Sequence, residues 1–283
     1  MNEIHDILSV FGSKVNNYDD CELYYRGFIN CEWKDEPSVF RNDRLKRENL
    51  FVEQVVCNYP DVFSNAHTID ILTQLQHYGG PTRMLDATSN FLVALFFACG
   101  GWEQVVDRKI FEENEYIDGL IRIYTVKKDK IKSIDSETVT LIANISRLKY
   151  TDETFGKLPW KCERDLGVWQ TDDELILKNA EDANDVVFVK TQLNNPRVRA
   201  QFGSFFLFGG LLGIEGIKNP DCLRQQHITK MKLEMPHRYV MDEIKIPANY
   251  KKKILNDLKT YFGMSFQTLC PEKQDFIQTI ANY

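Results

Sequence analysis

Residues 76–98 read QHYGGPTRMLDATSNFLVALFFA, and the interpretation of the whole chain starts from this stretch. Its first part places a His, an Arg, an Asp and two Thr around Gly79, Gly80 and Pro81, which end a helix. Its second part, from Phe91 to Ala98, is apolar nearly all round, which predicts a helix deep in the protein. Polar side chains packed this densely between two buried elements indicate the wall of a site.

Outside this stretch, apolar spacing predicts helices early in the chain and strands in its middle. The predicted helices cover residues 45–62, 68–78, 89–99 (with Thr88 or Ser89 as N-cap) and 249–262. The predicted strands cover residues 22–28, 120–127, 186–192 and 204–208, with shorter candidates at 230–235 and 243–246. This segregation favours an α+β fold over regular βαβ alternation. We expect a helical N-terminal third and a mixed, mainly antiparallel sheet with helices packed around it.

The chain of 283 residues is predicted to form a single domain over 1–283, with a candidate insertion or lid at 128–183, where the pattern is least regular. Its net charge of −6 gives no global basic field for nucleic acid. No apolar run approaches the roughly 18 residues of a membrane span. The first ten residues carry Glu3 and Asp6 and have no basic n-region, so we expect no secretion signal.

The cysteines number seven, an odd count, and none forms a C-x-x-C pair. This pattern argues against a zinc ribbon, a redox pair and a disulfide framework. We expect the cysteines to act as small, buried apolar residues of a protein in a reducing, cytoplasmic setting.

The run Lys251-Lys252-Lys253 is expected to form a solvent-exposed face of a helix.

Arg26 follows a run of residues that favour a strand and precedes Gly27. A fixed guanidinium can bind two oxygens of a pyrophosphate or carboxylate at once. The alternative is a partly buried Arg paired to a structural acid such as Asp86. Gly27 would let a ligand or another backbone approach closely.

The other polar residues also have two readings each. His77, near a helix end, either interacts favourably with the helix dipole or acts on a ligand. A metal site is disfavoured because no second metal ligand stands at helical spacing from His77. Arg83 and Asp86 point to opposite faces of an extended segment, and for Asp86 we favour a buried structural role paired to an Arg. Thr82 and Thr88 share a face, and either could be a cap or turn residue. Gln201 either points into a cleft or is a buried amide bonded to main chain.

Three segments together resemble the FRG-domain family. Tyr25-Arg26-Gly27 resembles the motif that gives the family its name, and residues 76–88 with the apolar helix after them look like its central signature. A third block is similar at Arg199, Gln201, Gly203 and Phe205. The resemblance spans about residues 22–280, with departures at Tyr25, where Phe is usual, and Ala87, where an aromatic is common.

A more distant similarity is to ADP-ribosyltransferases, in which an Arg on an early strand organises the NAD end of the cleft. A Thr or Ser ends a later strand just before an Ala-rich apolar helix, and a Glu acts on the nicotinamide ribose. Arg26 matches the first position, Thr82 (or else Thr88) the second, and Gln201 falls nearest the third. A neutral Gln cannot stabilise positive charge on the ribose as a carboxylate would, so catalysis would need an acid elsewhere in the chain.

These resemblances imply a polar cleft that binds a nucleotide-like ligand, with NAD as the expected cofactor. The expected cofactor-binding residues are Arg26, Gly27, His77, Tyr78, Thr82 and Arg83, and the expected catalytic residues are Arg26, Thr82 and Gln201. The implied activity is ADP-ribosyl transfer to a protein or nucleic-acid acceptor, or NAD glycohydrolysis, by a toxin or phage-defence effector. The alternative is a non-catalytic module that senses a nucleotide or binds a macromolecule. A nuclease is disfavoured because no close-set carboxylate pair for Mg²⁺ is evident.

Overall fold

The computed structural model describes residues 3–15, 19–63, 66–77, 79–148, 180–191, 196–212 and 229–271. Its helices are α1 (Glu3–Lys14), α2 (Glu48–Asn58), α3 (Pro60–Phe63), α4 (Thr68–His77), α5 (Phe91–Ala98), α6 (Glu103–Val106), α7 (Arg108–Asn114), α8 (Glu137–Ile145), α11 (Ala180–Ala183), α12 (Pro196–Gln201), α14 (Lys251–Phe262) and α15 (Phe266–Leu269). Its strands are β1 (Cys21–Phe28), β2 (Met84–Thr88), β3 (Gly119–Lys127), β4 (Ile131–Ser133), β5 (Val186–Lys190), β6 (Gly203–Phe208), β7 (Leu211–Leu212), β8 (Thr229–Lys230) and β9 (Val240–Ile246).

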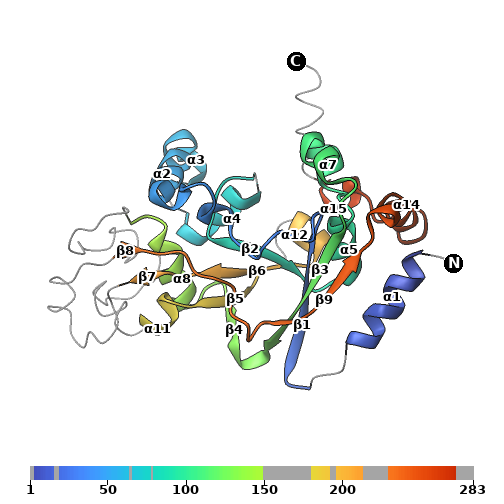
Figure 1. Ribbon diagram of the computed structural model, residues 1–283. Coiled ribbons are helices and arrows are strands. Elements are labelled where there is room, and N and C mark those ends of the chain that lie inside the picture. Colours follow the sequence, from blue (N-terminus) through green and yellow to red (C-terminus); the bar gives the residue numbers. More distant parts are fainter. Residues whose placement is uncertain are drawn as a thin grey trace, which may run out of the picture.

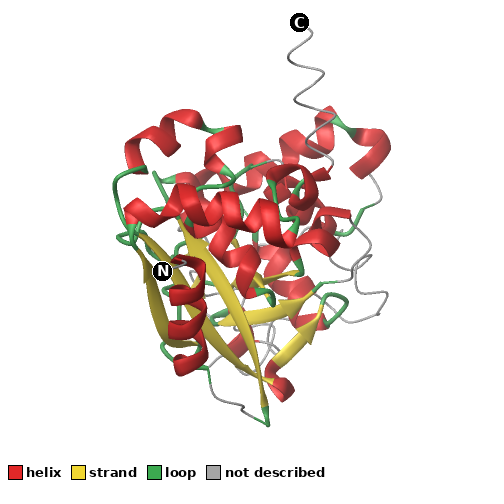
Figure 2. Ribbon diagram, turned by 90° about the vertical axis from the view of Figure 1, so that its right-hand side faces the viewer, coloured by secondary structure: helices red, strands yellow, loops and turns green. Residues whose placement is uncertain are grey.

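The centre of the protein is a seven-stranded sheet in the order β4-β5-β6-β2-β1-β3-β9 (Figures 1 and 2). β4 and β5 run parallel, and the neighbouring pairs from β5 through β9 run antiparallel. β7 and β8 form a separate two-stranded sheet. The predicted α+β fold with a mixed, mainly antiparallel sheet and a helical N-terminal part is therefore confirmed.

The large sheet forks between its two central strands. β1 pairs with β3 along its whole length from Cys21 to Phe28, but it pairs with β2 at a single position, Tyr25 with Thr88. Because β1 and β2 are antiparallel, Arg26 to Phe28 run opposite the earlier residues of β2 without ladder bonds between them. The sheet is thus divided into one half of β4, β5, β6 and β2 and another of β1, β3 and β9.

Each half of the sheet carries its own group of helices. Apolar residues of α2, α4 and α8 pack on β2, β5 and β6. Those of α1, α5, α14 and α15 pack on β1, β3 and β9. Figure 1 shows α2 to α4 and α5, α7, α14 and α15 as two groups over opposite ends of the sheet. A third apolar cluster, which includes Tyr24, Tyr124 and Phe206, covers the other face.

The apolar helix α5 lies directly on the sheet, as its composition predicts. A Cβ atom on Gly27 would stand 1.9 Å from the carbonyl oxygen of Ala94, so β1 can approach α5 this closely only through a glycine. The N-cap differs from the prediction. Asn90, and neither Thr88 nor Ser89, caps the helix, because Thr88 still belongs to β2 and the side chain of Asn90 accepts the N–H of Leu92.

Other predicted elements shift at their ends. The helix expected over 45–62 begins as a 3-10 turn, and α2 ends at Asn58 before α3 starts at Pro60, whose ring and missing N–H break the run. The strand expected at 230–235 shrinks to Thr229–Lys230. Within the candidate insertion, residues 128–148 add β4 and α8 to the fold, and residues 149–179 lie outside the described ranges.

Candidate functional site

A cleft of about 320 Å³ opens where β1 and β2 diverge. Its floor comes from β1, β2 and β6, and its walls come from α4, α12, α5 and the start of α6. Both helix groups of Figure 1 therefore contribute to its walls. The lining combines several arginines and carboxylates with the rings of Trp33, Phe97 and Trp102.

Arg26 lies at the fork itself. Its Nη1 donates to the main-chain carbonyl of Asp86 over 2.5 Å, and its guanidinium carbon stands 5.2 Å from the centre of the Phe28 ring. The expected alternative, a pair with the Asp86 carboxylate, is not the contact observed. The Nε atom is buried with no hydrogen-bond partner in the described part of the protein. Arg26 therefore bridges the two halves of the sheet and keeps donor capacity for a ligand.

A second guanidinium, that of Arg41, lines the same cleft. Burial and the nearby positive charge of Arg26 lower the pKa of Arg41, whereas Glu36 acts in the opposite sense. Arg41 donates to the main-chain carbonyl of Glu36 over 2.7 Å. Two like charges in one cleft favour an anion there, since it relieves their repulsion.

Thr82 stands behind the wall of the cleft instead of lining it. Its side chain is fully buried, and its hydroxyl donates to the side-chain oxygen of Gln76. The amide nitrogen of Gln76 in turn donates to a carboxylate oxygen of Asp86 over 3.0 Å. Asp86 is exposed and lines the cleft, so the favoured prediction of a buried Asp86 paired to an Arg is wrong. Thr82 orients polar neighbours from outside the cleft.

Arg83 also lies outside the cleft, in a buried cluster with Glu48 and Lys230. Its side chain is 0% exposed; its Nε and Nη2 donate to the Glu48 carboxylate over 2.8 and 2.6 Å, and its Nη1 donates to two main-chain carbonyls of residues 208 and 209. Lys230 donates to the same carboxylate over 2.9 Å. Burial would raise the pKa of Glu48, but the two cations lower it to about 2. Every donor group of Arg83 is thus engaged in fixing α2 to the sheet.

Thr88 and Gln201 meet at the cleft floor, and both line it. The Thr88 hydroxyl donates to the main-chain carbonyl of Gln201 over 2.6 Å. The Gln201 amide nitrogen donates to the main-chain carbonyl of Leu269 (3.0 Å) and contacts the Cys270 sulfur (3.3 Å). Of the two open readings for Gln201, these contacts favour the amide bonded to main chain.

His77 lines the cleft from the end of α4, and Gly27 does so from β1. The main-chain carbonyl of His77 accepts a bond from Arg197 (2.9 Å), whose guanidinium lies over the Trp102 ring at 4.5 Å. This chain of contacts joins α4, α12 and the segment before α6 at the cleft mouth. Tyr78, expected to bind the cofactor, lies outside the described residues.

A carboxyl that sequence reasoning missed, Glu103, lines the wall at the start of α6. Its Oε2 is buried and has no hydrogen-bond partner in the described part of the chain. Burial raises the pKa of Glu103 to about 7, although a hydrogen bond from its own backbone N–H and the charges of Arg26 and Lys251 act to lower it. The available signal was Gly100-Gly101, which ends α5 and turns the chain back toward the sheet.

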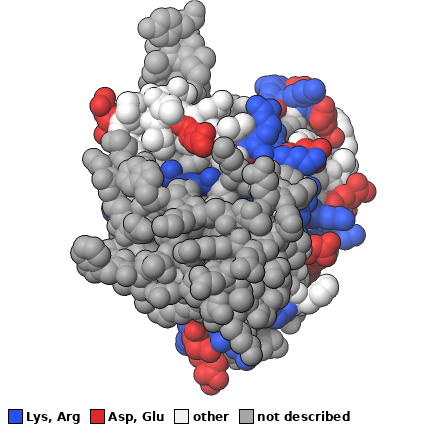
Figure 3. Space-filling view, turned by 90° about the vertical axis from the view of Figure 1, so that its left-hand side faces the viewer, with Lys and Arg blue, Asp and Glu red and all other residues white. Residues whose placement is uncertain are grey.

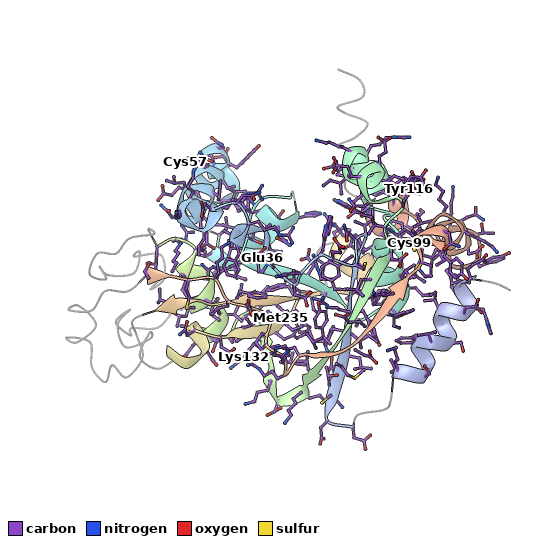
Figure 4. The ribbon with its side chains drawn as sticks, viewed as in Figure 1. Glu36, Cys57, Cys99, Tyr116, Lys132 and Met235 are labelled. Atoms are coloured by element: carbon purple, nitrogen blue, oxygen red, sulfur yellow. The ribbon has the colours of Figure 1, made fainter. Side chains whose placement is uncertain are left out.

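Other kinds of site find no support among the described residues. No group of three His, Cys, Asp or Glu side chains is placed to hold a metal ion there, and no helix there is long and apolar enough to cross a membrane. Cys57 and Cys99 belong to different helix groups (Figure 4), and the described Cys21, Cys31, Cys57 and Cys99 are free thiols. Cys99 and Cys270 are buried as expected, but Cys57 is exposed. In the described part of the face in Figure 3, basic and acidic side chains lie side by side.

Residues 21–105 match the FRG domain family, so this part of the chain carries an FRG domain. The matched segment contains β1, β2, α2 to α5 and the start of α6, and with them Arg26, Thr88 and Glu103. Gln201 lies beyond the matched segment. No curated protein and no solved structure matches the chain.

Proposed function

We propose that the cleft of this FRG-domain protein binds an anionic, nucleotide-like ligand, with NAD first among the candidates. We further propose that the protein transfers ADP-ribose from NAD to a protein or nucleic-acid acceptor, or cleaves the nicotinamide bond with water. One observation carries the proposal: Arg26 bridges the fork of the sheet beside Arg41, and both guanidiniums line a cleft that also presents aromatic rings.

The chemistry of the lining fits the parts of a dinucleotide. Guanidinium groups bind pyrophosphate oxygens two at a time, and Arg26 and Arg41 together supply the positive charge. The rings of Trp33, Phe97 and Trp102 offer flat faces to a base or to nicotinamide, a contact worth about 1–3 kcal/mol per base in nucleic-acid complexes. A largely apolar cleft with a few fixed polar groups is the usual form of a cofactor site.

The order of residues along the sheet supports ADP-ribosyl chemistry in particular. Arg26 lies on β1, Thr88 ends β2 just before the apolar helix α5, and Gln201 ends α12, two residues before β6 begins. These three strands are neighbours at the centre of the sheet. This arrangement is similar to the one described for ADP-ribosyltransferases, with Thr88 in the second position in place of Thr82. Its third position is the weak point, because Gln201 is neutral.

That weakness favours a second candidate, a non-catalytic module that senses a nucleotide. The Gln201 amide is bonded to Leu269 and Cys270, which are parts of the scaffold, and it carries no charge for a developing cation. A sensor needs the arginines and the aromatic rings but no proton acceptor. The two candidates therefore share the ligand and differ in turnover.

Thermal melting with NAD, ADP-ribose, ATP and a short RNA tests the ligand class. A ligand at a hundred times its Kd should raise the stability by about 2.7 kcal/mol. Nicotinamide release and labelling of lysate components with labelled NAD then test catalysis. Binding with turnover supports the transferase or glycohydrolase, and binding without turnover supports the sensor. If neither NAD nor ADP-ribose binds, the proposed ligand is wrong.

A cellular test addresses the toxin or defence role. Either activity would consume NAD or modify cellular components, so induced expression should slow the growth of a bacterial host and lower its NAD content. Arg26→Ala should relieve both effects, because a cofactor without its anchor loses the orientation needed for reaction. Equal growth inhibition by the Arg26→Ala protein would argue against this use of the cleft.

A further inference from the structure

Glu103 is a carboxyl of the cleft wall that has one oxygen without a hydrogen-bond partner among the described residues. It stands in the first turn of α6, and its Oε2 is buried without a hydrogen-bond partner among the residues that the structure describes. The carboxyl accepts a hydrogen bond from its own backbone N–H, but one of its oxygens is left unsatisfied, and buried polar atoms in proteins are normally satisfied. A titratable group with a perturbed pKa and an unsatisfied oxygen on the wall of a cleft is a candidate functional residue.

The charges around Glu103 come from several elements. Arg26 on β1 and Lys251 on α14 attract its negative charge, and Asp107, at the end of α6, repels it. The Lys251 ammonium is already held by the main-chain carbonyls of Ile29 (2.6 Å) and Asn114 (3.1 Å). Among the other charged or titratable side chains that line the cleft are Asp86 on β2, Arg41, His77 on α4 and Arg197 on α12. Arg26 is therefore the cation that Glu103 shares with the cleft.

We infer that Glu103 contacts the ligand held by Arg26 and is the group that accepts a proton during its reaction. The inference rests on the proposed function and names the carboxyl that Gln201 does not supply. Arg26 and Glu103 line one cleft from different elements, so a ligand anchored by the guanidinium lies within the reach of the carboxyl.

The bond between C1′ of the nicotinamide ribose and the ring nitrogen breaks, and its electron pair neutralises the pyridinium nitrogen. A bond forms between C1′ and the oxygen of water or of an acceptor hydroxyl. The proton of that oxygen passes to the Glu103 carboxylate and then to solvent. An acid-base group works best when its pKa lies near the working pH, and burial raises that of Glu103 to about 7.

The first test needs no ligand. Carboxyl-labelled glutamate, with the resonance of Glu103 assigned through Glu103→Gln, should show this side chain titrating near pH 7, well above its ordinary range. Arg26→Gln should move the titration to higher pH, because it removes a positive charge that favours the carboxylate. A titration in the ordinary range of Glu, or one that ignores Arg26→Gln, would overturn the inference whether or not NAD binds.

The second test uses NAD. Nicotinamide release by the wild-type protein should rise with pH and level off above about pH 7, since the acceptor must be ionised. Glu103→Gln should lower turnover roughly 10²–10⁴-fold while the Kd for ADP-ribose changes little. Glu53→Gln, the same substitution on the exposed face of α2, is the matched control and should behave as wild type.

The outcomes separate the inference from the proposed function. Unchanged turnover in Glu103→Gln would overturn the inference and leave the proposed activity in place. A wild-type protein that binds NAD without turnover would overturn the proton-accepting role of Glu103. Failure to bind NAD and ADP-ribose would overturn the proposed function, and the ligand-free titration would still decide whether Glu103 and Arg26 share one cleft.

Discussion

The guanidinium of Arg26 donates to the main-chain carbonyl of Asp86 over 2.5 Å, across the point where β1 and β2 separate. The two strands pair only at Tyr25 with Thr88, so the carbonyl of Asp86 has lost its ladder partner on that side. Arg26 supplies a donor to this carbonyl in place of a neighbouring strand. The same residue thus bridges the fork and lines the cleft.

Replacing Arg26 by Lys should separate these two roles. An ammonium can still donate to the carbonyl of Asp86, so we expect the stability to fall by no more than about 1 kcal/mol, the net worth of an ordinary hydrogen bond. The bidentate fork is lost, so the Kd for ADP-ribose should rise by about tenfold or more. Melting curves and calorimetric titration measure the two effects.

Arg122 provides the matched control, because it stands opposite Arg26 in the register of β1 and β3. Its guanidinium bonds Asp35 over 2.6 Å and Glu243 over 2.8 Å, and it does not line the cleft. Arg122→Lys should therefore lower the stability and leave ligand binding intact. The opposite pattern, with Arg26→Lys unfolding and Arg122→Lys losing ligand, would reassign both residues.

Removing the charge of Glu48 should be strongly destabilising. Glu48→Gln leaves Arg83 and Lys230 buried without their common counter-ion, and breaking a buried ion cluster in this way costs about 3–5 kcal/mol. Glu53→Gln, on the exposed side of the same helix, should stay within about 0.5 kcal/mol of wild type. Urea unfolding measures the difference, and a loss below about 1 kcal/mol would show that the cluster is not what fixes α2.

The pH dependence of this cluster has a definite sign. The pKa of Glu48 is about 2 in the folded protein, below its ordinary value of about 4.3 in an unfolded chain. The unfolded chain therefore binds the proton first, and the stabilisation is complete above about pH 4.3 and is lost as the pH falls toward 2. Wild-type stability should drop in acid, and Glu48→Gln should show less of that drop.

The contact between β1 and α5 gives a prediction about packing alone. Gly27→Ala would put a Cβ atom 1.9 Å from the carbonyl oxygen of Ala94, so helix and strand must separate, and we expect a loss of about 2 kcal/mol or more. Gly12→Ala, in the exposed part of α1 with no neighbour within 4 Å, should instead stabilise by about 0.5–1 kcal/mol. A harmless Gly27→Ala would contradict the close approach.

Local pattern was enough to predict α5, β1 and the helix end at Gly79, because burial all round, strand propensity and a left-handed glycine are properties of short segments. Contacts between residues that are distant in the sequence could not be predicted from local pattern. Nothing near Arg83 indicates that its acid is Glu48 on α2, and Lys251 opens a run of three lysines that resembles a solvated helix face. The Lys251 side chain is nevertheless buried, and its ammonium donates to the main-chain carbonyls of Ile29 and Asn114.

The candidate site shows the same limit. The sequence singled out Arg26, His77 and Gln201, all of which line the cleft, because their segments combine polar side chains with glycine or strand context. It also singled out Thr82 and Arg83, which flank the cleft-lining residues in the sequence and point elsewhere in the fold. Which side of the chain faces the cleft depends on where the sheet forks, and that is a property of strand pairing between β1 and β2.

The stability of Glu103→Gln should exceed that of wild type in weakly alkaline solution. Between about pH 4.3 and 7 the folded protein retains a proton on Glu103 that the unfolded chain releases, so wild-type stability falls as the pH rises through this window. Gln carries no charge to desolvate, so at pH 8 we expect a gain on the order of 1–3 kcal/mol over wild type. At pH 4 the two proteins should be nearly equal. A constant difference across this range would mean that Glu103 titrates normally.

Gln201→Glu tests whether the third position of the ADP-ribosyltransferase arrangement is used in this protein. The amide nitrogen of Gln201 donates to the carbonyl of Leu269 and to the sulfur of Cys270, and a carboxylate in its place would face that carbonyl oxygen with no proton to share. We therefore expect a loss of about 1–3 kcal/mol, the usual cost of leaving buried polar groups unpaired, and no gain in nicotinamide release. If turnover rises instead, the carboxylate must reach the ribose from this position, and Gln201 would replace Glu103 as the residue nearest the reaction. Combining Gln201→Glu with Glu103→Gln distinguishes the two, since the double variant should stay inactive when Glu103 accepts the proton and regain activity when residue 201 does.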